Sequence, residues 1–104
     1  MDFEEMNGFL RQENERLLDS LPGLSEDNIA LAQSVKLSEE VGELGTAVLD
    51  AHQLQRPREE TTDKELAMEI ADVLITAMLL GETLGVDIEQ ALEQKMERID
   101  TRYE

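Results

Sequence analysis

The sequence contains no cysteine and no tryptophan, and its only aromatic residues are Phe3, Phe9 and Tyr103. Without cysteine the chain has no disulfide, no thiolate nucleophile and no zinc–thiolate site. The apolar residues are mostly Leu, Ala, Ile, Val and Met, a set that suits helix-on-helix packing better than the aromatic and β-branched preference of sheets. The sequence therefore predicts an all-α fold.

Basic residues are also scarce, with 9 Lys and Arg against 25 Asp and Glu and a formal net charge of −16. Binding to the phosphate backbone of DNA or RNA requires basic side chains that neutralise phosphates. This balance argues against a nucleic-acid duplex as a partner. A small phosphorylated ligand stays compatible if divalent metal ions supply the positive charge.

Long apolar runs are absent, since none approaches the roughly 20 residues of a membrane span. The acidic N-terminus lacks the basic start of a signal peptide. We therefore expect a soluble cytoplasmic protein with no membrane partner. The 104 residues, 40% of them hydrophobic, predict a single folded domain over residues 1–104 with a modest core.

Apolar spacing and helix caps predict a four-helix bundle-like subunit, with an N-terminal helix in residues 1–21 and a motif-bearing core in residues 25–103. Pro22-Gly23 breaks the pattern, Ser25 and Asp87 are expected caps, and Gly85 is an expected helix end. A capping box of Thr62 and Glu65 opens the third helix. The predicted helices are Asp2 to Leu21, Glu26 to Gln53, Thr62 to Leu84 and Ile88 to Thr101.

Hydrophobic patterning also predicts which faces are buried. The second helix has apolar residues on more than one side, including Leu31 and Val35, and is expected to lie between neighbours. The third helix is expected to be central. The fourth helix is expected to turn inward its apolar residues Ile88, Ala91, Leu92, Met96 and Ile99. Gly42 and Gly45 each cost about 1 kcal/mol in a helix interior, so we interpret them as space for a close neighbour or a ligand.

Two acidic motifs lie beside apolar stripes. Glu40 and Glu43 accompany a stripe of Leu37, Val41, Leu44 and Val48, and Glu69 and Asp72 hold the same positions in the matching segment Leu66 to Val73. Residues at i and i+3 project from one side of a helix. If the two helices pack antiparallel through these stripes, the four carboxylates converge.

Oxygen ligands without Cys or His favour Mg²⁺, Mn²⁺ or Ca²⁺ over zinc or copper. Glu40, Glu43, Glu69 and Asp72 are thus candidate metal ligands, with Glu39 adjacent. The alternative is a solvated acidic face. A di-iron bundle is rejected, because it needs Glu-x-x-His and Leu49 stands three residues before the only histidine, His52. His52 itself is interpreted as a surface or helix-end residue.

Basic residues cluster near the C-terminus, where Lys95, Arg98 and Arg102 share one short window. They form a candidate anion-binding surface. The alternative is that they are solvated charges that favour the C-terminal end of the helix dipole.

Four blocks in order resemble the MazG-like, all-α nucleoside triphosphate pyrophosphohydrolases, and the resemblance covers about Ile29 to Tyr103. The blocks are Lys36 to Leu44, Glu69 to Ile75, Leu84 to Ile88 and Lys95 to Arg102. The family signature is Glu-Glu-x-x-Glu followed by Glu-x-x-Asp. Relatives often carry Asn where this chain has Ile99, which affects the expected substrate contact more than the metal site.

The resemblance implies Mg²⁺-dependent hydrolysis of a nucleoside triphosphate or related nucleotide to the monophosphate and pyrophosphate, with nucleotide pool clean-up as the corresponding role and Mn²⁺ as a substitute metal. It assigns Mg²⁺ to the four candidate ligands. Glu39 and Glu40 become catalytic, Glu39 as a further ligand or as the group that orients the attacking water. Lys95 and Arg102 would contact the phosphate tail. Subunits of the family form homodimers or homotetramers.

Two other functions fit the same residues. An acidic helical interaction module would use the net charge of −16 to bind a basic partner. A degenerate relative would bind the nucleotide without cleaving it. Release of pyrophosphate in the presence of Mg²⁺ would distinguish the enzyme from both of these alternatives.

Overall fold

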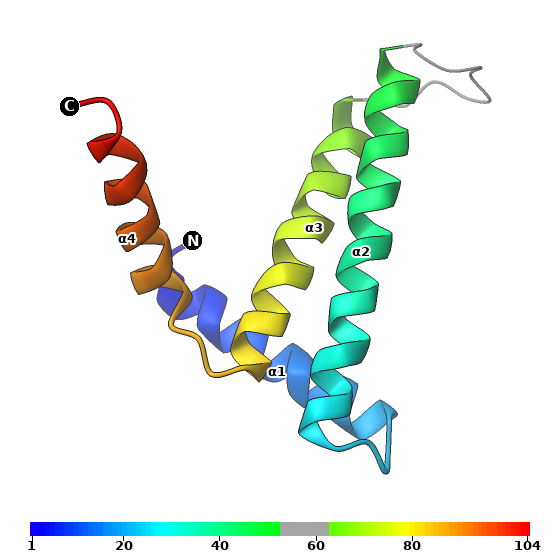
Figure 1. Ribbon diagram of the computed structural model, residues 1–104. Coiled ribbons are helices and arrows are strands. Elements are labelled where there is room, and N and C mark those ends of the chain that lie inside the picture. Colours follow the sequence, from blue (N-terminus) through cyan, green and yellow to red (C-terminus); the bar gives the residue numbers. More distant parts are fainter. Residues whose placement is uncertain (53–62) are drawn as a thin grey trace.

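The computed structural model describes residues 1–52 and 63–104 and contains, within these ranges, four helices and no strand (Figure 1). The helices are α1 (Phe3–Ser20), α2 (Glu26–Ala51), α3 (Asp63–Thr83) and α4 (Ile88–Thr101). The all-α prediction is confirmed. The expected Thr62 cap lies outside the described residues, as does Gln53, where α2 was predicted to end. The helix ends at Ala51 instead.

Helix ends are set by short-range signals in the sequence. Side-chain oxygens of Asp2, Ser25 and Asp87 accept hydrogen bonds from backbone N–H groups in the first turns of α1, α2 and α4. Gly85, at φ +73°, ends α3. Its N–H donates to Glu82 O and that of Val86 donates to Gly81 O, which is the Schellman pattern. The predicted roles of Ser25, Asp87 and Gly85 are confirmed.

The hairpin of α2 and α3 is the main structural unit. The two helices run antiparallel side by side, and α1 crosses one end of the pair (Figure 1). Each of the three helices contributes a buried aliphatic residue, Leu10 from α1, Ile29 from α2 and Leu79 from α3. This small core holds α1 against the hairpin.

The prediction that the fourth helix packs its apolar residues inward is wrong. After the turn at Gly85, α4 diverges from the hairpin (Figure 1), and no residue of α4 is buried. Leu92, Met96 and Ile99 are exposed, while Ile88 is half-buried close to Gly81 at the α3–α4 turn. The reason is that the Schellman turn directs α4 away before its apolar stripe meets α2 or α3. The four-helix bundle is therefore incomplete within one chain.

Burial of α2 between neighbours is also not found among residues 1–52 and 63–104. Leu31 and Val35 are 66% and 60% exposed. A Cβ placed on Gly42 or Gly45 would meet no atom of the described residues within 4 Å. Space for a neighbour inside this chain thus does not explain either glycine.

Among the described residues, no helix is both long enough and apolar enough to cross a membrane.

Candidate metal centre

Three carboxylates meet where α2 faces α3. Glu40 and Glu43 lie one turn apart on α2, and Glu69 lies on the antiparallel α3. One carboxylate oxygen from each residue lies within 4.8 Å of those from the other two. The matched motifs therefore do converge, because the antiparallel hairpin places their acidic positions at the same level along the axes of α2 and α3.

Burial separates Glu40 and Glu69 from a solvated acidic face, whereas Glu43 is exposed. Glu40 is 8% exposed and shares the inner face of α2 with Ile29 and Ala47. The Oε2 atoms of Glu40 and Glu69 are buried, and neither receives a hydrogen bond from residues 1–52 or 63–104. Buried anionic oxygens without partners are costly unless a cation compensates them. An all-oxygen set of this kind fits Mg²⁺, Mn²⁺ or Ca²⁺.

Lys36 supplies part of the compensation. Its Nζ lies 3.3 Å from Glu40 Oε1 and 3.7 Å from Glu39 Oε2. The hydrogen bond and charge of Glu40, followed by the charges of Glu39 and Glu43, raise the pKa of Lys36 above its usual value. The contact leaves Glu40 Oε2 unpaired, so one lysine does not balance the cluster.

Repulsion within the cluster is visible at Glu43. The negative charge of Glu40 raises the pKa of the Glu43 carboxyl above its ordinary value of 4.5, and partial desolvation and the charge of Glu69 add to the effect. The pKa of Glu43 thus indicates that the repulsion among these carboxylates exceeds the compensation that Lys36 provides.

Asp72 and Glu39 stand at the margin of the cluster. Asp72 is exposed on α3, one turn beyond Glu69, and lies outside the group of three converging carboxylates. Glu39 has a side chain that is 58% exposed and points its carboxylate to Lys36. The structure thus brings together three of the four predicted ligands.

Lys95 and Arg102 lie on another arm of the molecule. Lys95 is on α4 and Arg102 is the cap residue at its C-terminal end, and both side chains are exposed. Because α4 diverges from the hairpin (Figure 1), the chain does not fold these cations onto its own acidic cluster.

Sequence reasoning missed the part played by Lys36 and the polar contacts of Asn14 and Gln33. The spacing of Lys36 and Glu40, i to i+4, was a usable signal for their ion pair. No local signal marks Asn14 and Gln33, because they meet across α1 and α2. His52 is exposed at the C-cap of α2, as predicted.

The fold and the cluster define a helical protein in which three converging carboxylates could hold a metal ion. A family model described as the MazG-like family matches residues 31–104, and the chain belongs to that family. The chain is 34% identical over 73 residues to "Uncharacterized protein YpjD" of Bacillus subtilis (strain 168), an alignment that covers 69% of this chain and 65% of that protein. No solved structure matches.

Proposed function

We propose that the protein is a Mg²⁺-dependent nucleoside triphosphate pyrophosphohydrolase. The observation that carries the proposal is the convergence of Glu40, Glu43 and Glu69, with two buried oxygens that receive no hydrogen bond from the described part of the chain. Membership of the MazG-like family supports it. In the proposed reaction water hydrolyses the anhydride bond between the α- and β-phosphates, and the products are a nucleoside monophosphate and pyrophosphate.

Each acidic residue has a proposed part. Glu40, Glu43, Glu69 and Asp72 would hold Mg²⁺, or Mn²⁺ in its place. When bound, the metal would neutralise phosphate charge and lower the pKa of water. Glu39, exposed beside the cluster, would orient the attacking water and accept its proton. Lys36 would keep Glu40 in place through their ion pair.

We further propose that two chains associate through an exposed seam on α2. Residues 31, 35, 38, 42, 45 and 49 recur at alternating spacings of four and three, the seam pattern of paired helices. The seam combines exposed Leu31, Val35 and Leu49 with small residues, and both of its glycines face open space. A second copy of α2 would give those glycines the close neighbour that one chain does not provide.

Association would also bring the basic side chains of α4 to an acidic cluster. Lys95 and Arg102 lie on the diverging α4, so they would reach the phosphate tail of a substrate bound on a neighbouring subunit. A dimer, or a tetramer built from dimers, would thereby complete each site.

The test is hydrolysis of a nucleotide panel with Mg²⁺. Pyrophosphate release is expected, and Glu43→Gln or Asp72→Asn should lower kcat/KM by more than about 100-fold, since even outer-shell partners of metals cost roughly 10–100-fold. Glu93→Gln, on exposed α4, is the matched control and should keep full activity. Orthophosphate as the product, or equal activity in all variants, would overturn the proposal. No turnover and no heat of Mg²⁺ binding would favour the acidic interaction module.

A further inference from the structure

A cavity of about 410 Å³ lies between α1, α2 and α3 and adjoins the acidic cluster. Its walls are largely apolar, with Phe9 and Leu17 from α1 and Ile75 from α3, and Lys36 lines it as well. Because Lys36 Nζ lies 3.3 Å from Glu40 Oε1, one side chain joins the cavity to the metal cluster. An apolar cavity of this size with few polar groups is typical of a small-molecule site.

Gln33 is the buried member of the polar residues that line this cavity, and the others are Glu13, Lys36 and Thr76. Gln33 lies on α2 one turn before Lys36, lines the cavity and is only 7% exposed. Its side-chain amide has a donor end and an acceptor end, and the recognition chemistry depends on which end is available.

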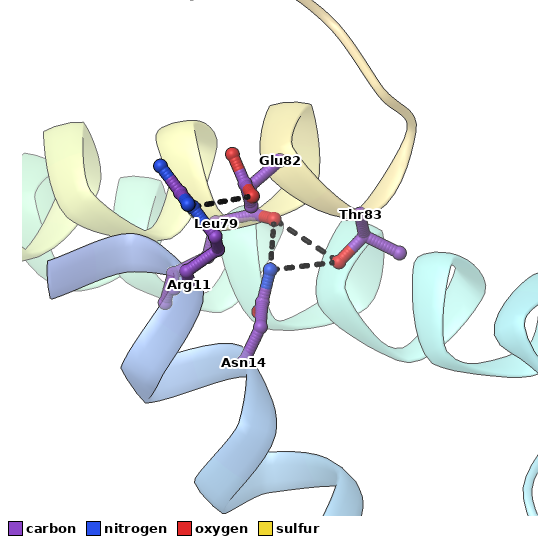
Figure 2. Close-up of polar contacts among 5 residues, drawn as sticks. All are labelled: Arg11, Asn14, Leu79, Glu82 and Thr83. Atoms are coloured by element: carbon purple, nitrogen blue, oxygen red, sulfur yellow. Dashed lines mark hydrogen bonds and ion pairs between the residues drawn. The ribbon is translucent and has the colours of Figure 1, made fainter. Parts of the chain in front are cut away.

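Asn14 fixes the orientation of that amide. Figure 2 shows the Asn14 side-chain nitrogen directed at the Leu79 carbonyl oxygen and the Thr83 hydroxyl, each 3.2 Å away. The Leu79 carbonyl only accepts hydrogen bonds, so Asn14 must present its Nδ2 there and its Oδ1 to α2. Gln33 must therefore donate from Nε2, and it does so to Asn14 Oδ1 at 2.9 Å.

The orientation of the Gln33 amide leaves its Oε1 atom as a buried hydrogen-bond acceptor. Gln33 Oε1 is buried and receives no hydrogen bond from any residue in the described parts of the chain. An unpaired buried acceptor is unfavourable. Because Gln33 Oε1 is itself covered, a ligand must displace neighbouring side chains of the cavity wall to donate a hydrogen bond there, and that bond removes the penalty. A ligand that presents an acceptor instead meets repulsion.

We propose that this cavity holds the nucleobase and that Gln33, oriented by Asn14, selects a base with an exocyclic amino group over its keto counterpart. This inference rests on the proposed nucleotide substrate. Cytosine and adenine donate from their amino groups, whereas uracil and hypoxanthine carry a carbonyl oxygen at the same position. Gln33 is the specificity residue, and Asn14 is a positioning residue.

The experiment measures kcat/KM for two matched pairs, CTP against UTP and ATP against ITP, in the full-length protein with Mg²⁺. At least one pair should favour the amino base by about 10-fold or more, the ratio that roughly 1.4 kcal/mol provides. The pair that discriminates tells whether the cavity takes a pyrimidine or a purine. A ratio near one for both pairs would overturn the inference.

Variants test the mechanism of selection. Gln33→Leu should bring the ratio toward one. Asn14→Leu should do the same while Gln33 remains, because the amide is then free to turn its donor end to the ligand. Ser34→Ala, next in sequence but on the exposed face of α2, should keep the ratio of the unmodified protein. An unchanged ratio in a folded Asn14→Leu variant would contradict the role of the amide.

A binding measurement separates this inference from the proposed function. Calorimetry with CMP, UMP, AMP and IMP reports on the cavity without hydrolysis. Amino-over-keto preference in binding supports the inference even if no triphosphate is cleaved. Turnover of triphosphates without any such preference would leave the hydrolase in place and refute the role of Gln33.

Discussion

Glu43 shows how one residue links stability to metal binding. Its pKa is raised above 4.5, so between 4.5 and the raised value the folded protein binds more protons than the unfolded chain. The metal-free protein therefore loses stability as pH rises through the raised pKa, and the loss is complete above that pKa. A bound cation would remove the repulsion that causes it.

We predict that Glu43→Gln raises the Tm of the metal-free protein at pH 7 and removes the increase in Tm that Mg²⁺ gives the unmodified protein. The first effect follows from the loss of repulsion by Glu40, and the second from the loss of a ligand. Thermal melts in chelator and in Mg²⁺, from pH 4.5 to pH 8, measure both. Glu93→Gln should show neither effect, and a lower Tm for metal-free Glu43→Gln would contradict the prediction.

For individual residues, the sequence predicted that acidic side chains of two helices converge, and three of the four named residues do so. The pairing of Glu40 and Glu43 with Glu69 follows from repeated local spacing. The position of Asp72 outside the converging group depends on how far α3 is rotated against α2, which no local pattern encodes.

Helix α1 is attached to the hairpin through one buried leucine and one polar network. It is held to the hairpin by the fully buried Leu10 and by the hydrogen bonds of Asn14 to Gln33 and to Leu79 and Thr83. The ion pair of Arg11 and Glu82, at 4.0 Å, is exposed on the arginine side and adds little (Figure 2). Since α1 forms one wall of the cavity, the docking of α1 and the proposed ligand binding would be coupled.

We predict that Leu10→Ala lowers the free energy of unfolding by about 2–5 kcal/mol, the usual cost of emptying a buried leucine site. Leu18→Ala, on the same helix but 44% exposed, should cost less than half as much. Urea denaturation followed by circular dichroism gives both values. Equal losses for the two variants would mean that α1 is not docked through Leu10.

Among the described residues, far more large apolar side chains are exposed than buried. Exposed apolar residues lie on α2, α3 and α4, including Leu31, Leu74 and Met96. Contiguous exposed apolar surface on a small protein indicates an interaction face. The net charge of −16 on each chain opposes self-association, so the two effects are in competition.

We predict a dimer of the 11.7 kDa chain in light scattering after size exclusion, with a dissociation constant that falls as salt rises. Salt screens the repulsion between acidic chains and leaves the apolar seam of α2 intact. A monomer at every salt concentration, or a dimer weakened by salt, would contradict the seam.

Gly45→Ala tests the seam directly. Within one chain the added methyl meets open space and should stabilise the helix by about 1 kcal/mol. Between two chains it would separate the helices and raise the dissociation constant by about 10-fold. Gly8→Ala, which also meets open space, is the matched control and should leave the dimer unchanged. If Gly45→Ala is more stable but has an unchanged dissociation constant, the dimer interface does not include this part of α2.

The sequence by itself determined the helices, most of their ends and the paired acidic motifs, because caps and i to i+3 spacings are local properties of the chain. Tertiary structure alone decided that Glu40, Glu43 and Glu69 converge without Asp72, that α4 departs from the hairpin, and that Asn14 orients Gln33. These features depend on the relative rotation and direction of helices distant in sequence. Packing sets both quantities, and periodicity within one helix does not contain them.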